Sequence, residues 1–298
     1  MDHDAGREYP RAGTMSAPRF VAIGHVTLDR FGTTIRPGGT ALYSAITAHR
    51  LGVSAGILTR HGDDFPLETI PPQIEVVSLP SAFTTVFEHQ AGDGGRTLSV
   101  ERLAEPIGAD DLPEDWRDAQ VVLLGPIIGE VDPRLMTRFP DATIGAAAQG
   151  WLRRRASDGR LAPAPWRDPR LLVSRLHALF VSDEDIPGQE AATIELFQQI
   201  PVGVITAGQL GVLLFVNGER YEIQPYGVAE VDATGAGDVF ATVFMLHEDR
   251  DGSPWEAAAY AACAAALSVE GEGPSAIPDA ARLARAVQQY RRALSHLS

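Results

Sequence analysis

The stretch Asp232-Ala233-Thr234-Gly235-Ala236-Gly237-Asp238 decides the fold, and it opens an apolar run from Val239 to Leu246. Its small residues let backbone N–H groups face outward at the start of a helix, where they and the helix dipole can hold an anion. A capping box does not explain the stretch, because a Thr234 N-cap would need Glu or Gln where Gly237 stands. The carboxylate of Asp238 beside an anion site therefore needs another explanation.

Two interpretations of Asp238 remain. It can serve the helix dipole as an acid in the first turn. It can also act in phosphoryl transfer, where amides hold the transferring phosphate and a carboxylate takes the proton of an attacking hydroxyl.

The stretch also resembles the C-terminal signature of the ribokinase-like, or PfkB-type, sugar kinases, D-x-T-G-A-G-D followed by an apolar helix. The resemblance implies an α/β fold: a three-layer α/β/α domain with a mostly parallel central sheet and a small β lid. It makes Asp238 the catalytic base and Gly235, Ala236 and Gly237 the anion hole. Asp232 and Thr234 would lie beside a loop that binds a monovalent cation such as K⁺ in many members.

Composition excludes several classes of protein. The chain has 298 residues, 25 basic against 39 acidic side chains and a formal net charge of -14. This balance argues against a broad nucleic-acid or anionic-membrane surface. The sequence has no P-loop, no zinc-spaced Cys/His cluster and no G-x-S-x-G elbow.

We expect a disordered leader over residues 1–18 and a single kinase domain over 19–298. The N-terminus lacks the apolar core of a signal peptide, and no stretch approaches the length of a membrane helix. These features predict a cytoplasmic protein without membrane or nucleic-acid partners.

The residues that bind the phosphoryl acceptor are predicted to begin after a buried strand over residues 19–24. Asp29 follows that strand, where an open α/β sheet binds ligands, although a solvated turn acid is the alternative. The Gly38-Gly39 pair before a helix can be a tight turn. By resemblance, however, Asp29, Gly38, Gly39, Thr40 and Tyr43 bind the substrate, and Tyr43 stands where many members have Asn.

The lid is predicted to be short in its first segment, residues 30–36, with a second hairpin-like segment at 83–103. An exposed hairpin without a role is the alternative for the second segment. Because relatives often dimerise through the lid, the resemblance implies a monomer or a homodimer.

From residue 118 onward, strands alternate with helices, which predicts a parallel sheet covered on both faces. The segment Gln149-Gly150-Trp151-Leu152-Arg153 resembles that of myo-inositol-kinase-like members and implies that Arg153 contacts substrate. The alternative is that the arginines at 153–155 form a solvated face.

Metal and nucleotide contacts follow from the resemblance. Ser182 and Asp185 replace the Asn and Glu of relatives, so Asp185 would meet Mg²⁺ through water, while helix capping by Ser182 or Asp183 is the alternative. The predicted ATP contacts are Thr206, Gly208 and Gly211. The alternative is that these residues form only a common turn. Cys263 would be an adenine neighbour or, as a lone cysteine in an alanine-rich helix, a buried structural thiol.

The sequence thus predicts an ATP- and Mg²⁺-dependent kinase, with K⁺ as a further cofactor, acting on a hydroxyl of a sugar or polyol, with myo-inositol-like substrates favoured. A nucleoside kinase of the same fold and a non-catalytic sugar or nucleotide sensor are the alternatives.

Overall fold

A computed structural model describes residues 17–92 and 95–295. Nearly all of the predicted leader, residues 1–16, lies outside the described residues. Within them, no helix is both long enough and apolar enough to cross a membrane.

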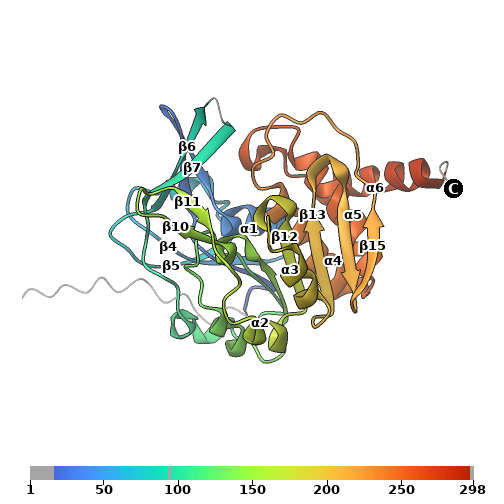
Figure 1. Cartoon of the computed structure of the whole chain (residues 1–298), viewed down its shortest axis with the longest axis horizontal. Coiled ribbons are helices and arrows are strands. Elements are labelled where there is room, and N and C mark those ends of the chain that lie inside the picture. Colours follow the sequence, from blue (N-terminus) through green and yellow to red (C-terminus); the bar gives the residue numbers. More distant parts are fainter. Residues whose placement is uncertain (1–16, 93–94, 296–298) are drawn as a thin grey trace, which may run out of the picture.

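A nine-stranded sheet forms the centre of the molecule, in the order β15-β14-β13-β12-β9-β8-β1-β4-β5 (Figure 1). Its strands from β1 to β13 pair in parallel, whereas β14 and β15 are antiparallel. The strands are β1 (Phe20–Ile23), β4 (Ala55–His61), β5 (Glu75–Pro80), β8 (Val121–Leu124), β9 (Thr143–Ala147), β12 (Ala178–Ser182), β13 (Val202–Thr206), β14 (Val212–Val216) and β15 (Glu219–Ile223). The mostly parallel sheet predicted from the alternating pattern is confirmed.

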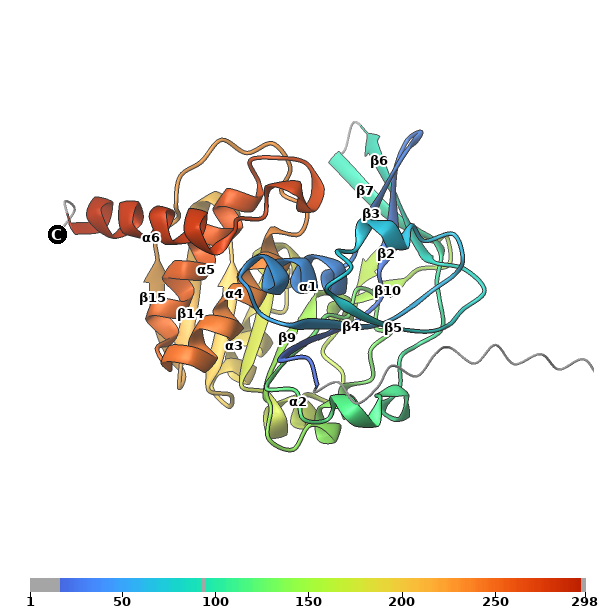
Figure 2. The same cartoon turned by 180° about the vertical axis from the view of Figure 1, so that it is seen from behind.

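Helices cover both faces of this sheet. They are α1 (Thr40–Arg50), α2 (Pro169–Arg175), α3 (Glu190–Phe197), α4 (Ala236–Asp251), α5 (Pro254–Ser268) and α6 (Ala280–Ser295). Figure 2 shows α1, α4, α5 and α6 in front of the sheet, and α2 and α3 belong to the opposite side, which faces the viewer in Figure 1. Each face buries its own apolar core, so the three-layer α/β/α architecture is confirmed.

The lid is a separate four-stranded sheet in the order β3-β2-β6-β7. Its strands are β2 (Thr27–Phe31), β3 (Thr34–Gly38), β6 (Thr85–Gly92) and β7 (Gly95–Arg102), and a further hairpin joins β10 (Arg153–Arg155) to β11 (Leu161–Pro163). The first lid segment is wider than residues 30–36, because antiparallel pairing continues to Thr27 opposite Gly38. Asp29 therefore lies within a lid strand rather than in a loop.

The order in which successive strands are added to the sheet reverses between β1 and β8. From β1 it proceeds to β4 and β5 on one side, and from β8 to β9, β12 and β13 on the other. Open α/β sheets bind ligands outside the carboxyl ends of their strands at such a switch point. Here those ends come so close that a Cβ on Gly24 would lie 2.3 Å from the carbonyl oxygen of Gly125.

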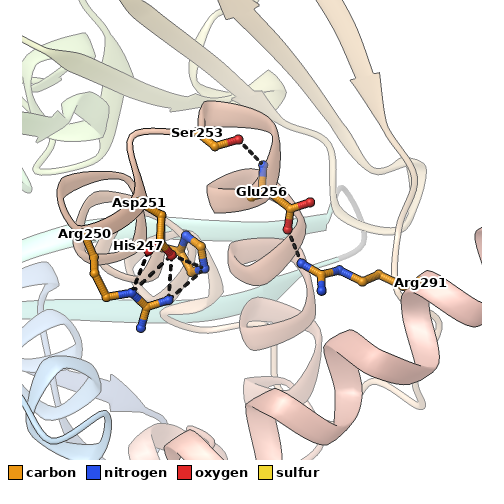
Figure 3. Close-up of polar contacts among 6 residues, drawn as sticks. All are labelled: His247, Arg250, Asp251, Ser253, Glu256 and Arg291. Carbon is orange, nitrogen blue, oxygen red and sulfur yellow. Dashed lines mark hydrogen bonds and ion pairs between the residues drawn. The ribbon is translucent and has the colours of Figure 1, made fainter.

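Polar contacts fix the far end of α4, the helix that follows the signature stretch (Figure 3). Arg250 donates to Asp251 at 2.7 Å and to the His247 ring at 3.2 Å. Burial lowers the pKa of His247, so its neutral ring accepts this hydrogen bond. Next to it, Ser253 caps the N-terminus of α5 and Glu256 pairs with Arg291 of α6. The Glu256–Arg291 pair joins α5 to α6, and the His247 ring, whose centroid lies 4.0 Å from that of Tyr260, joins α4 to α5.

Candidate active site at the start of helix α4

The signature stretch forms a tight turn that leads into α4. Gly235 is the N-cap and has a left-handed φ of 80°. A Cβ at this position would lie 2.2 Å from the Tyr43 ring, so the turn requires glycine for two independent reasons. The helix start is pressed against α1 through this contact.

Only part of the predicted anion hole is open. The Ala236 N–H donates to the carbonyl of Ala233 at 3.2 Å, so this amide is already engaged. Gly237 is exposed, a Cβ there would meet nothing within 4 Å, and a second helical position has no intrahelical acceptor for its N–H. Gly237 therefore offers the amide most accessible to an anion.

Asp238 occupies the first turn of α4 beside these amides. Burial raises the pKa of Asp238 to about 7, although a hydrogen bond from the Thr40 hydroxyl opposes the shift. The nearby carboxylates of Asp185 and Asp29 raise it further, and Arg153 lowers it. A carboxylate whose pKa lies near neutrality suits proton transfer better than an ordinary solvated acid does.

The acceptor residues predicted from sequence meet Asp238 at the N-terminus of α1. Gly39 is the N-cap of α1 with φ 97°, and a Cβ there would lie 2.4 Å from the carbonyl oxygen of His25. Asp29 accepts from Thr27 at 3.1 Å, and a Cβ on Gly38 would lie 2.3 Å from its carboxylate. The Gly-Gly pair is thus required by close backbone approach to the strand that carries Asp29.

Tyr43 is buried against Gly235 and does not project into an open space. Burial and the carboxylates of Asp232 and Asp238 raise the pKa of its phenol, which therefore stays neutral. The Tyr43 ring packs against the turn at Gly235. This is a packing role in addition to any contact with substrate.

Arg153 and Asp185 form an ion pair at 3.1 Å, with only 3% of the Asp185 side chain exposed. Gln149 donates to the same carboxylate oxygen at 3.1 Å, and the Ser182 N–H donates to the other at 3.1 Å. The Ser182 hydroxyl in turn accepts from the Glu184 N–H, which is the capping alternative considered from the sequence. The three arginines do not share one environment, since Arg153 is half-buried while Arg154 and Arg155 are exposed.

Asp232 and Thr234, which were predicted to lie beside a monovalent cation, already take part in hydrogen bonds within the protein. Asp232 accepts from the Thr234 N–H at 3.0 Å and from the Gly273 N–H at 3.4 Å. Arg36 of the lid lies 3.4 Å from the same carboxylate. Sequence analysis did not single out Arg36, although its position opposite Asp29 in a lid hairpin was a signal.

The predicted nucleotide turn lies at the carboxyl edge of the sheet, since Thr206 ends β13 opposite Ser182 of β12. Gly208 and Gly211 both have left-handed φ values, 51° and 93°, and a Cβ on Gly211 would lie 2.4 Å from the Ile223 carbonyl oxygen. Turn geometry thus accounts for Gly211, and contacts of Thr206 and Gly208 with ATP stay a prediction. Between them Leu210 is 85% exposed, an apolar side chain left on the surface of this turn.

Cys263 is fully buried in α5, where burial raises the pKa of its thiol to about 12. This burial fits the alternative of a structural thiol. A position of Cys263 next to adenine stays a prediction.

Sequence analysis also missed a buried acid that supports the site. Glu130 accepts from the N–H groups of Ile127 and Ile128 at 2.8–3.0 Å and from that of His25 at 3.4 Å. It thereby joins the loop after β8 to the loop after β1, the two loops of the switch point. No sequence motif marks Glu130, because its partners are backbone groups.

The first prediction concerns Gly235. Gly235→Ala is expected to lower the free energy of unfolding by about 2–4 kcal/mol, because it combines an unfavourable φ with overlap of the Tyr43 ring. Gly237→Ala is the matched control: the position is helical and open, so stability should hold or rise by about 0.5–1 kcal/mol. Urea unfolding of both variants tests this, and equal losses would contradict the assigned contacts.

The second prediction concerns the raised pKa of Asp238. The folded state binds this proton more tightly than the unfolded chain, so ionisation of Asp238 reduces stability as pH rises from about 4 to about 7. Asp238→Asn removes the charge, and its stability advantage over wild type should grow across that window to about 1–3 kcal/mol at pH 8.

The control is Asp249→Asn on the same helix, which removes a carboxylate that pairs with Arg19. It should show no gain in stability with rising pH. Urea unfolding at a series of pH values distinguishes the two, and an Asp238→Asn advantage independent of pH would contradict the raised pKa.

Comparison with known proteins finds similar sequences among small-molecule kinases. Residues 173–280 match the model of the pfkB family carbohydrate kinases. A cytidine kinase of Thermococcus kodakarensis is 29% identical over 264 residues, with 79% of this chain and 90% of the relative covered. An inositol 3-kinase of Oryza sativa is 26% identical over 228 residues, and the chain spans about half of that relative: 70% of this chain and 55% of the relative are covered.

Solved structures show the same fold. A pyrophosphate-dependent kinase of the ribokinase family, solved with a pyrophosphate analogue and myo-inositol, matches with a TM-score of 0.75 at 22% identity, covering 86% of this chain and 96% of that one. The family resemblance inferred from the signature stretch is confirmed. The chain therefore has the ribokinase fold, its segment 173–280 matches the pfkB family carbohydrate kinases, and the curated proteins that it resembles are small-molecule kinases.

Proposed function

We propose that this protein transfers the γ-phosphoryl group of ATP to a hydroxyl of a sugar, a polyol or a nucleoside. The observation that carries the proposal is the position of Asp238, a carboxylate with its pKa near 7, beside the open Gly237 amide at the start of α4. A structural first-turn acid would gain from full solvation, whereas the partial burial of Asp238 brings its pKa towards the range that suits a base.

In this mechanism Asp238 accepts the proton of the acceptor hydroxyl as that oxygen attacks phosphorus. The amides of Gly235 and Gly237, at the positive end of the α4 dipole, stabilise charge that develops on the transferring group. Arg153 lies within electrostatic range of Asp238 and adds positive charge on the same side. Asp29 lies on strand β2 of the lid and is proposed to bind other hydroxyls of the acceptor.

The residues present fit a Mg²⁺ ion that is bound mainly by the phosphates of ATP. Mg²⁺ prefers oxygen ligands, keeps several waters and neutralises phosphate charge. Both oxygens of the Asp185 carboxylate already accept hydrogen bonds, from Gln149, Arg153 and Ser182, so Asp185 would not bind the ion directly and is proposed to meet it only through the waters that Mg²⁺ keeps. Thr206 and Gly208, at the carboxyl edge of β13, are proposed to contact the nucleotide.

A myo-inositol-like acceptor is proposed from the Gln149 to Arg153 segment. Both ends of that segment contact Asp185, so the segment places an amide and a guanidinium next to the proposed metal position. Polar groups of this kind suit a ring that carries hydroxyls on every carbon.

A specific observation favours the nucleoside as a second candidate. Phe31 and His89, paired across β2 and β6, stack with ring centroids 4.3 Å apart and an interplanar angle of 12°. They line a pocket of about 500 Å³ together with Arg36, Gln90, Val231 and other residues of the lid and the signature loop. An aromatic wall next to the acceptor site suits a planar base, which stacking stabilises by about 1–3 kcal/mol.

The third prediction tests the chemistry itself. Wild-type protein, incubated with ATP or pyrophosphate and a panel of polyols, hexoses, pentoses and nucleosides, should phosphorylate at least one class of acceptor. Asp238→Asn should keep donor affinity within about threefold and lose about 10²–10⁴-fold in kcat, the usual contribution of a general base.

The pH dependence adds a second measurement to this prediction. Because kcat/KM reports the free enzyme, it should rise with pH and level off above about 7 as Asp238 ionises. Near-normal turnover of Asp238→Asn would overturn the base assignment. Failure of every acceptor despite tight ATP binding would instead support the sensor hypothesis.

The fourth prediction separates the two acceptor classes. His89→Ala shortens the aromatic wall at a residue remote from the proposed base, so it should raise KM for a nucleoside about 5–50-fold with little change in kcat. KM for myo-inositol should change less than about twofold. An equal effect on both acceptors would contradict base stacking at this wall.

A further inference from the structure

Arg36 joins three segments that are distant in the sequence. It lies in β3 of the lid, and its guanidinium approaches Asp232 of the signature stretch at 3.4 Å and Glu272, in the loop after α5, at 3.1 Å. The guanidinium carbon also lies over the Phe31 ring, 5.2 Å from its centroid. One cation thus bridges the lid, the turn before α4 and the loop after α5.

The Asp232 carboxylate needs a positive partner. Only 16% of this side chain is exposed. Burial alone would raise the pKa of Asp232, but hydrogen bonds from Thr234 and Gly273 and the charge of Arg36 outweigh burial and hold the pKa below its usual value. Asp232 is therefore ionised, and its two carboxylate oxygens set the path of the loop that leads to Gly235.

These contacts do not fit the monovalent cation expected beside Asp232 and Thr234. The carboxylate that would ligate such an ion accepts two backbone N–H groups and meets the guanidinium. Thr234 presents its backbone N–H to Asp232, and an N–H donor repels a cation. A K⁺ ion at the Asp232 carboxylate would also lie next to the guanidinium that already faces this acid, and the two positive charges would repel each other.

We propose that Arg36 takes the place of the monovalent cation in this protein. It is a positioning residue: its charge neutralises Asp232, and its two nitrogens hold the turn and the following loop so that the Gly235 and Gly237 amides face the transferring phosphate. Phosphoryl transfer then needs no added K⁺. The inference rests on the proposed function, because the amides matter only if a phosphate binds there.

The guanidinium is suited to this role in a way that an ammonium is not. Its Nη1 and Nη2 atoms reach two different carboxylates in one plane, and the planar group packs on an aromatic ring. A lysine at position 36 would keep the charge but could bridge the two acids less well. The conservative variant therefore separates the effect of charge from that of geometry.

The experiment compares wild type, Arg36→Gln, Arg36→Lys and Arg30→Gln. Arg30 is the matched control, because it lies in the same lid hairpin and pairs with Glu101 within the lid. Turnover with the best acceptor and the thermal unfolding midpoint are measured in K⁺, Na⁺ and tetramethylammonium chlorides at a constant ionic strength of about 0.1 M, so that screening is equal.

We expect wild-type kcat to agree within about twofold in the three salts, and its unfolding midpoint within about 1 °C. Arg36→Gln should lose about 10–100-fold in kcat with a smaller change in donor KM, because misplaced amides act mainly in the transition state. Arg36→Lys should recover part of that loss, and Arg30→Gln should retain wild-type kcat.

Selective activation of wild type by K⁺, by tenfold or more, would overturn the inference. So would a K⁺-specific rise in the wild-type unfolding midpoint, or unchanged kcat in Arg36→Gln. If wild type phosphorylates no acceptor, the proposed function fails. The unfolding midpoints still decide whether the wild-type protein takes up K⁺.

Discussion

The contact between the Tyr43 ring and Gly235 is the constraint on which the site depends. It sets how closely the N-terminus of α4 approaches α1, because a single methyl group at position 235 would overlap the ring. Through this approach the Thr40 hydroxyl reaches Asp238, and the positive ends of two helix dipoles meet at the carboxyl edge of the sheet. Burial of Asp238, and hence its unusual affinity for a proton, follows from that packing.

Four carboxylates gather around this point, and each is compensated differently. Asp185 has an arginine and an amide, Asp232 has an arginine and backbone amides, and Asp29 has the Thr27 hydroxyl. Asp238 has a single hydroxyl and a more distant arginine. Asp238 lacks the direct arginine contact that Asp185 and Asp232 have, which suits it to exchange a proton.

The sequence predicted the elements that depend on local pattern. The helix after Gly39, the central strands β8, β9, β12, β13 and β14 and the turn before α4 all follow from glycine placement and apolar periodicity, whereas the hairpin of β10 and β11 was not predicted. It did not reveal contacts made by tertiary packing: Arg36 reaches Asp232 across 196 positions, and Glu130 binds backbone groups that no side-chain motif encodes. The complete burial of Cys263 in α5 likewise depends on tertiary packing that the sequence does not display.

The pairing of β2 with β6 has a consequence for how such a lid arises. The two strands are parallel, and a parallel pair requires a long crossover between its members. Here the connection runs through β3 of the lid and then through α1, β4 and β5 of the main body of the domain. The lid is therefore not a hairpin that evolution could graft onto a finished core or exchange as a cassette. Its two halves are separated in the sequence by α1, β4 and β5, so changes in the lid and in the core have to be accommodated jointly.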